Sequence, residues 1–216
     1  MRIDLHTHSI LSDGELTPAE LVRRAMVIGH DAIAITDHVD MTNVDLVVPA
    51  VVRAAELTED YIRTIPGVEI THVPPKQIDK VIKRAKKLGA QWIVVHGETV
   101  AEPVAPGTNL MAAGNSEVNV LAHPGLITDD VMEKAVRNGV LIEITGRAYH
   151  NITNGHVLAV ARRFGAKMVV NSDAHAPGNL MDEVAAMKVA VGAGMTEKEA
   201  YDAVCVTPFD AVRKLK

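Results

Sequence analysis

Residues 3–8 read Ile-Asp-Leu-His-Thr-His, and Ser12-Asp13-Gly14 follows shortly after them. The apolar start of this stretch predicts a short strand that runs directly into two histidines, His6 and His8. Residues two apart in a strand project to the same side, so both imidazoles are expected to face one way. Two imidazoles at the end of a strand are half of a metal site. The remaining ligands must then come from other strands.

The composition of the chain favours an α/β protein without a membrane span. Of its 216 residues, 48% are hydrophobic and only 3% are aromatic, a palette that fits buried parallel strands. The formal net charge of -5 argues against nucleic acid or an anionic membrane surface as the main partner. The single cysteine, Cys205, excludes an intramolecular disulfide and a cysteine-based zinc cluster. Neither a signal peptide nor a membrane-spanning apolar run is visible, so we expect a cytoplasmic protein.

Short apolar runs alternate with helical patterns along the whole chain. Seven such units without a linker predict one domain over residues 1–216, built as a closed parallel barrel or a doubly wound open sheet. A full eight-unit barrel needs about 250 residues, so this chain is short by roughly one unit. The longest irregular stretch, 97–117, is expected to shape a pocket. Strands are expected at about 2–6, 31–36, 67–71, 91–95, 118–122, 140–144 and 167–171. Helices are expected to start at Thr17, near Pro49, after Pro75 and at Thr196, and to span about 128–138, 153–164 and 180–192.

Residues that can bind metals follow most of the predicted strands, at the edge where both architectures place their active sites. Taken singly, a histidine or aspartate there is more often a loop residue or a helix cap, but that reading weakens when strand after strand ends this way. The set contains six histidines and three carboxylates, namely His6, His8, Asp13, His38, Glu69, His96, His123, Asp173 and His175. Nine ligands without a thiolate suit two or three divalent ions of Zn, Mn or Fe. His30, His72, His150 and His156 are expected to lie outside the ligand set, with only His150 near the pocket.

This pattern resembles the polymerase and histidinol phosphatase (PHP) family, through His6-Thr7-His8, Asp13, Thr36-Asp37-His38, Glu69, His96, His123 and Asp173-Ala174-His175. The resemblance implies a distorted seven-stranded (β/α) barrel with three metal ions. One ion would be held by His6, His8, Glu69 and Asp173. Glu69 would bridge to a second ion, held with His96 and His123, while Asp13, His38 and His175 would hold the third. Asp37 would orient a neighbouring residue.

The charge of such a centre favours phosphate esters. Adding three divalent ions, three carboxylates and one hydroxide leaves a formal charge of about +2, which attracts a phosphate dianion. The expected reaction is attack of a metal-bridging hydroxide on phosphorus, with Asp173 and His175 at the site. Arg147, beyond the sixth predicted strand, would add a bidentate phosphate contact, and a surface salt bridge is the competing interpretation.

Three functions fit these expectations. The first is hydrolysis of a small phosphorylated metabolite, as in histidinol phosphatases. The second is a phosphodiesterase or exonuclease acting on nucleotides or nucleic acid ends. It ranks second because aromatic residues are scarce and only Tyr149 lies near a strand end, so nucleic acid is not expected as a partner. The third is a metal-stabilised module without catalysis, which ranks last because all nine ligands are present.

Overall fold

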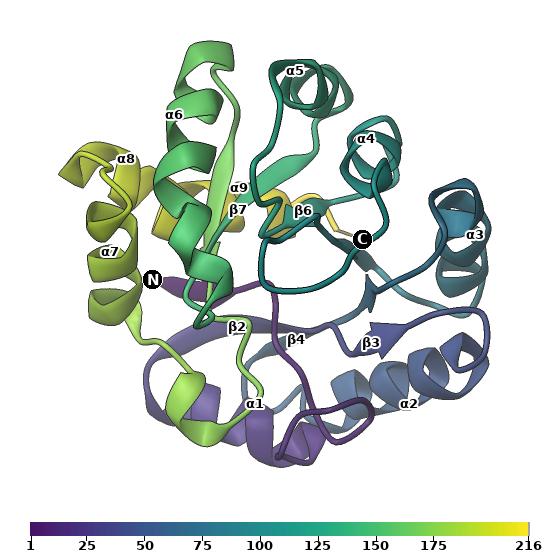
Figure 1. The fold of residues 1–216 in the computed structure, drawn as a ribbon. Coiled ribbons are helices and arrows are strands. Elements are labelled where there is room, and N and C mark those ends of the chain that lie inside the picture. Colours follow the sequence, from purple (N-terminus) through teal and green to yellow (C-terminus); the bar gives the residue numbers. More distant parts are fainter. Residues whose placement is uncertain (216) are drawn as a thin grey trace.

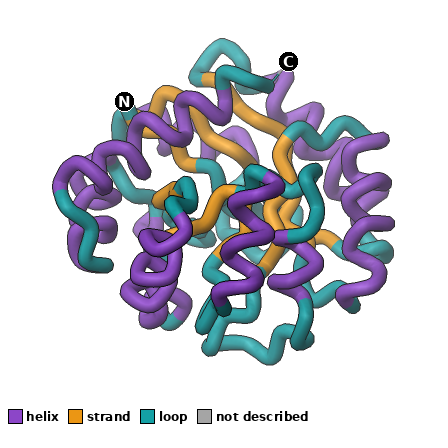
Figure 2. The backbone as a smooth tube through the Cα atoms, turned by 90° about the horizontal axis from the view of Figure 1, so that it is seen from above, coloured by secondary structure: helices purple, strands orange, loops and turns teal. Residues whose placement is uncertain are grey.

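The computed structural model describes residues 1–215 as a parallel barrel with helices around it (Figures 1 and 2). Seven strands follow one another in the order β1-β2-β4-β5-β6-β7-β8, and the short β3 pairs with β4 off this path. The distorted seven-stranded barrel predicted from the sequence is therefore confirmed. The strands are β1 (Arg2–Asp4), β2 (His30–Ile35), β3 (His38–Val39), β4 (Arg63–Ile70), β5 (Trp92–His96), β6 (Val120–Ala122), β7 (Leu141–Thr145) and β8 (Met168–Asn171).

Helices lie between successive strands, as the alternating sequence pattern predicts, and the chain continues in further helices after β8. They are α1 (Pro18–Val27), α2 (Val44–Leu57), α3 (Ile78–Lys87), α4 (Thr108–Ala113), α5 (Asp129–Asn138), α6 (Asn154–Phe164), α7 (Glu183–Gly192), α8 (Glu197–Tyr201) and α9 (Thr207–Val212). Short 3-10 turns occupy Pro75–Gln77, His150–Thr153 and Pro177–Asn179, and a π-helical turn joins α8 to α9. Among the described residues, none of the helices is both long and apolar enough to span a membrane.

The predicted start of the helix near Pro49 and the predicted end of the first strand were both wrong. The helix expected from near Pro49 begins five residues earlier, at Val44, and contains the proline. Val44, Val47, Val48 and Val51 are buried along one side of α2, and that burial outweighs the single backbone hydrogen bond that proline removes. The first strand ends at Asp4 rather than at residue 6, yet the chain stays aligned with β8 through a bridge between Thr7 and Ala174.

The barrel is closed between its first and last strands by a seam beyond the strand ends. His8 N donates to Ala174 O at 2.9 Å, and Asp173 N donates to His6 O at 3.0 Å. Arg2 lies beneath this seam and donates to the carboxylate of Asp4 at 2.7 Å, with neither side chain exposed. The seam therefore brings residues 6–8 against residues 173–174, from opposite ends of the chain.

The interior of the barrel is apolar at one end and polar at the other. Ile3, Leu5, Ile65 and Trp92 belong to an inner cluster of buried side chains, to which α9 adds Val212. The Trp92 indole donates to Leu5 O at 3.1 Å, so even its polar atom has a partner. A second and larger cluster lies between the strands and the surrounding helices. At the carboxyl ends of the strands, histidines and carboxylates replace the apolar side chains.

Candidate metal centre

Glu69, on β4, lies at the middle of the polar end and is fully buried. Its Oε2 atom is 3.2 Å from His6 Nε2 and 3.4 Å from His8 Nε2. The same oxygen is 3.0 Å from His38 Nδ1, and Oε1 is 3.4 Å from His123 Nε2. One carboxylate thus faces imidazoles that follow β1 and β6 and an imidazole on β3.

Asp173, just beyond β8, faces the same imidazoles from the other side of the seam. Its Oδ1 is 3.2 Å from His8 Nε2 and 3.7 Å from His6 Nε2, and its Oδ2 is 3.6 Å from His123 Nε2. The backbone of Asp173 has φ 51°, a left-handed conformation that side chains other than glycine seldom adopt. Strain of this kind persists only where surrounding contacts hold it, here the hydrogen bond to His6 O.

An outer group forms around Asp13, in the loop after β1. Its Oδ1 is 3.3 Å from His175 Nε2, 3.4 Å from His38 Nε2 and 4.0 Å from His8 Nδ1. Asp37 holds this loop in place, because it accepts hydrogen bonds from Ser9 and from the Ser12 hydroxyl. These hydrogen bonds are consistent with the orienting role expected for Asp37.

A third group contains His96, His123 and His150, all buried, with one ring nitrogen of each within 4.8 Å of the others. His96 and His123 were expected near one another, but His150 was expected outside the ligand set. It reaches the group because the turn after β7 folds back over the barrel. Sequence spacing carries little information about such a turn, since His150 lies five residues beyond the end of its strand.

Glu143, on β7, was also absent from the predicted site. The carboxylate is fully buried and accepts from His6 Nδ1 at 2.8 Å and from His123 N at 3.0 Å. Asn171 Nδ2 donates to it as well, at 2.8 Å. A carboxylate on one ring nitrogen of a histidine directs the other nitrogen, here His6 Nε2, toward a metal. The sequence feature that could have indicated Glu143 is a charged residue in an otherwise apolar strand.

The buried polar atoms at this end of the barrel provide a direct test of whether the residues fit metal ions. Within residues 1–215, no hydrogen-bond partner satisfies His6 Nε2, both His8 ring nitrogens, both Glu69 oxygens or Asp173 Oδ1. Such groups are costly unless something binds them. Two ligand atoms on a tetrahedral ion are about 3.4 Å apart, and the nitrogen–oxygen separations around Glu69 match this spacing. The residues around Glu69 and Asp173 therefore fit divalent ions.

The metal-free protein is expected to release protons when it binds Zn²⁺. Burial lowers the pKa of His38, but Glu69 and Asp13 outweigh burial and raise this pKa to about 10. A metal must displace that proton, so affinity should rise with pH by roughly tenfold per unit for each proton released. In contrast, burial and the neighbouring His38 lower the pKa of His8 to about 3, so His8 is already neutral.

Competition with a chelator at pH 6.5 and 8.5, with calorimetry in two buffers of different ionisation enthalpy, measures both effects. An affinity for Zn²⁺ that did not change over this range would contradict the protonated state assigned to His38.

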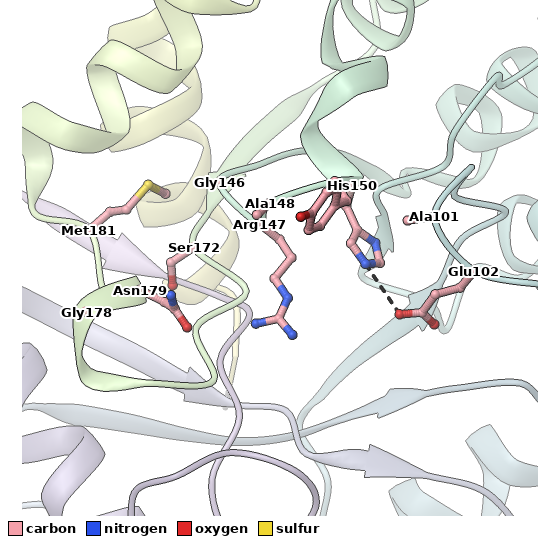
Figure 3. Close-up of a pocket in the computed structure, with 11 residues that line it drawn as sticks. Ala101, Glu102, Gly146, Arg147, Ala148, His150, Ser172, Gly178, Asn179 and Met181 are labelled. Atoms are coloured by element: carbon pink, nitrogen blue, oxygen red, sulfur yellow. Dashed lines mark ion pairs between the residues drawn. The ribbon is translucent and has the colours of Figure 1, made fainter.

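A cavity of about 630 Å³ adjoins these groups (Figure 3). Arg147 extends into it from the turn after β7, between Ser172 on one side and His150 on the other. Among the described residues the Arg147 guanidinium has no ion-pair partner, so the surface salt bridge is not observed. The buried Ser172 hydroxyl also lacks a hydrogen-bond partner. A cation and a hydroxyl therefore remain available to a ligand beside the carboxylates and imidazoles.

Comparison with known proteins identifies the family. The model of the PHP domain matches residues 4–98, and an uncharacterized protein of Methanocaldococcus jannaschii is 49% identical over the full length of both chains. The chain belongs to the PHP family. The PHP family binds divalent metals and is in general one of hydrolytic phosphoesterases, which agrees with the histidine and carboxylate groups described above.

More distant relatives carry functional names. Ribonuclease P protein component 3 of Methanosarcina barkeri is 24% identical over 95% of this PHP chain and 86% of its own. A 5′-3′ exoribonuclease of Haemophilus influenzae is 41% identical over 70 residues, which are 32% of this chain and 23% of the exoribonuclease. A chain in the structure of archaeal ribonuclease P with mature tRNA has a TM-score of 0.70, covering 99% of this chain and 94% of that one. At 18% identity, this structural likeness shows a shared fold and nothing more.

Proposed function

We propose that this PHP protein is a metal-dependent phosphatase that hydrolyses a phosphate monoester of a small metabolite. The observation that carries the proposal is the unpaired Arg147 beside a cluster of buried imidazoles and carboxylates whose polar atoms lack partners. An arginine fork is suited to two phosphoryl oxygens, and nothing else within the described part of the chain neutralises it. The adjoining cavity has room for the remainder of a small substrate.

Different residues of the chain have different roles in the proposed reaction. Ions held by the nine residues would supply hydroxide at neutral pH and would neutralise phosphoryl charge. Asp173 faces His8 and His123, and His175 faces Asp13 and Asp173, so these two residues help to hold the proposed metal site together. Arg147 would bind the phosphoryl group beside the ions that the carboxylates would hold, and Glu143 keeps His6 in a single tautomer. The scissile group is therefore oriented by Arg147 and by the carboxylate-fixed imidazoles.

Phosphate release from a panel of monoesters and diesters tests this proposal. Protein stripped with a chelator should release none, and Mn²⁺ or Zn²⁺ should restore turnover of at least one small monoester. A protein that binds metal and remains inert on the whole panel would overturn the phosphatase proposal. Turnover of diesters or of nucleic acid ends alone would favour the second candidate.

The second candidate is hydrolysis at nucleotide or nucleic acid ends, and Tyr149 favours it. This side chain is 77% exposed, lines the same cavity as Arg147 and is held by a backbone with φ 68°. An exposed aromatic ring beside a phosphate contact is a platform on which a base stacks. The ribonuclease names of two relatives count against our expectation that nucleic acid is not a partner. That expectation rested on the net charge of the whole chain, which does not report the charge at one site.

Arg147→Ala tests the phosphate contact that both candidates share, and Tyr149→Ala distinguishes between them. Arg147→Ala should raise KM for every phosphate substrate by roughly 10- to 150-fold, the value of a charge-assisted hydrogen bond. Tyr149→Ala should raise KM by roughly 5- to 150-fold for nucleotides, through lost base stacking, and should leave the KM for glycerol 3-phosphate, which has no ring, unchanged. Steady-state kinetics on both substrates gives the comparison. Equal effects of Tyr149→Ala on both would remove the argument for a base platform.

A further inference from the structure

Glu102 lies in the loop between β5 and α4 and joins three histidines that come from different strands. Its Oε2 is 3.1 Å from His72 Nε2 and 3.3 Å from His96 Nε2, and its Oε1 is 3.4 Å from His150 Nε2. Figure 3 shows His150 and Glu102 pointing toward one another across the edge of the cavity. Neither Glu102 nor His150 is among the nine residues that the family resemblance assigns to metals.

The ring nitrogens of His96 and His150 differ in the partners that they have. His96 Nδ1 lies 3.1 Å from Gly97 O and donates to that carbonyl, so Nε2 of a neutral ring carries the lone pair that faces Glu102. A lone pair and a carboxylate oxygen repel one another unless a proton or a metal ion lies between them. The His150 ring is 7% exposed, and its Nδ1 has no hydrogen-bond partner within the described residues.

The loop that carries Glu102 is held at both of its ends. Glu98 Oε1 accepts from Gly107 N at 3.0 Å and from Asn109 N at 2.8 Å, which ties the two ends of the loop together. A Cβ atom on Gly125 would lie 2.0 Å from Glu98 O, so the loop packs directly on the backbone after β6. On the other side, His72 reaches Glu102 from a left-handed backbone with φ 53°. Glu102 therefore lies in the middle of a loop whose two ends are anchored.

We infer that Glu102 and His150 are ligands of a divalent cation held together with His96 and His123. Each of the three imidazoles has a ring nitrogen within 4.8 Å of the other two. The two Glu102 oxygens lie 3.3 Å from His96 Nε2 and 3.4 Å from His150 Nε2, close to the spacing of about 3.4 Å between two ligand atoms on one ion. When this ion is bound, the loop at 97–107 is fastened over the site by Glu102. The inference concerns metal binding and does not require that the protein hydrolyse phosphate esters.

Titration of the stripped full-length protein with Co²⁺, followed by absorbance and by competition with a chelator, tests the inference. Glu102→Gln and His150→Gln should each weaken one bound ion at least tenfold and leave the others at their original affinity. Glu56→Gln, at an exposed position on α2, is the matched control and should bind every ion as the unaltered protein does. Unfolding curves of the loaded proteins verify that each variant is folded.

Hydrogen exchange of the loop provides a second readout that does not depend on affinity. Metal should slow exchange at 97–107 in the unaltered protein and should have little effect on this loop in Glu102→Gln. Unchanged affinity for every ion in both variants, or loop exchange that ignores metal, would overturn the inference and leave Glu102 as an ion-pair partner of protonated histidines. Absence of phosphatase activity in the loaded protein would instead count against the proposed function alone.

Discussion

Glu69→Gln is expected to reduce phosphate ester hydrolysis on the order of 10³-fold or more and to lower the number of bound metal ions. The carboxylate lies within 3.4 Å of His6, His8, His38 and His123, so it reaches the imidazoles of more than one proposed ion. An amide keeps the size of the side chain and removes its charge. A metal centre supplies several kcal/mol of transition-state stabilisation, which corresponds to about three orders of magnitude in rate.

Metal content by elemental analysis and turnover on the best substrate measure the two effects together. Glu56→Gln again serves as the control, because it makes the same chemical change far from the site. If Glu69→Gln kept full metal content and more than a tenth of the activity, Glu69 would not bridge the proposed ions.

Arg2→Met is expected to destabilise the fold by about 3–5 kcal/mol, the usual result of removing one partner from a buried ion pair. Arg2 and Asp4 are both inaccessible to solvent, and Arg2 also donates to the carbonyls of Ile3, Val170 and Met181. Met fills most of the space but leaves the Asp4 carboxylate buried and unpaired. The free energy of unfolding in urea, with the m-value as a check on two-state behaviour, measures the loss.

The control for Arg2→Met is Arg53→Met, an exposed position on α2 for which we expect a change within about 0.5 kcal/mol. Because Asp4 also accepts from Ser172 N at 3.2 Å, metal affinity should weaken in Arg2→Met even below the unfolding transition. A loss of less than about 1 kcal/mol would show that Arg2 is not essential to the closure of the barrel.

Much of the candidate site was predictable because parallel strands place their carboxyl ends at one edge. His96 and His123 each follow an apolar run, so the strand pattern alone indicated that they would meet. Glu69 was predictable for the same reason, as a carboxylate inside an otherwise apolar strand. Glu143 has the same pattern on β7, and only its observed contact with His6 distinguishes an orienting carboxylate from a metal ligand.

The contributions of loops could not be predicted in this way. His150 and Glu102 lie in segments whose path depends on turn geometry and on what the loops pack against, and neither is encoded in a periodic pattern. The helix that contains Pro49 escaped prediction because burial of its valines outweighs the local preference of proline. Similarly, a basic residue at position 2 gives no sign in the sequence that it will be buried.

The stretch at residues 3–8 shows which features can be predicted from the sequence and which depend on tertiary contacts. By itself, the sequence determined the alternation of strands and helices, and with it the set of side chains delivered to one end of the barrel. Only the tertiary structure decided that Thr7 pairs with Ala174, that Arg2 is buried under this seam, and that Glu143, Glu102 and His150 join the site. Strand periodicity is a local property of the chain, whereas barrel closure and loop packing depend on contacts between residues more than a hundred positions apart.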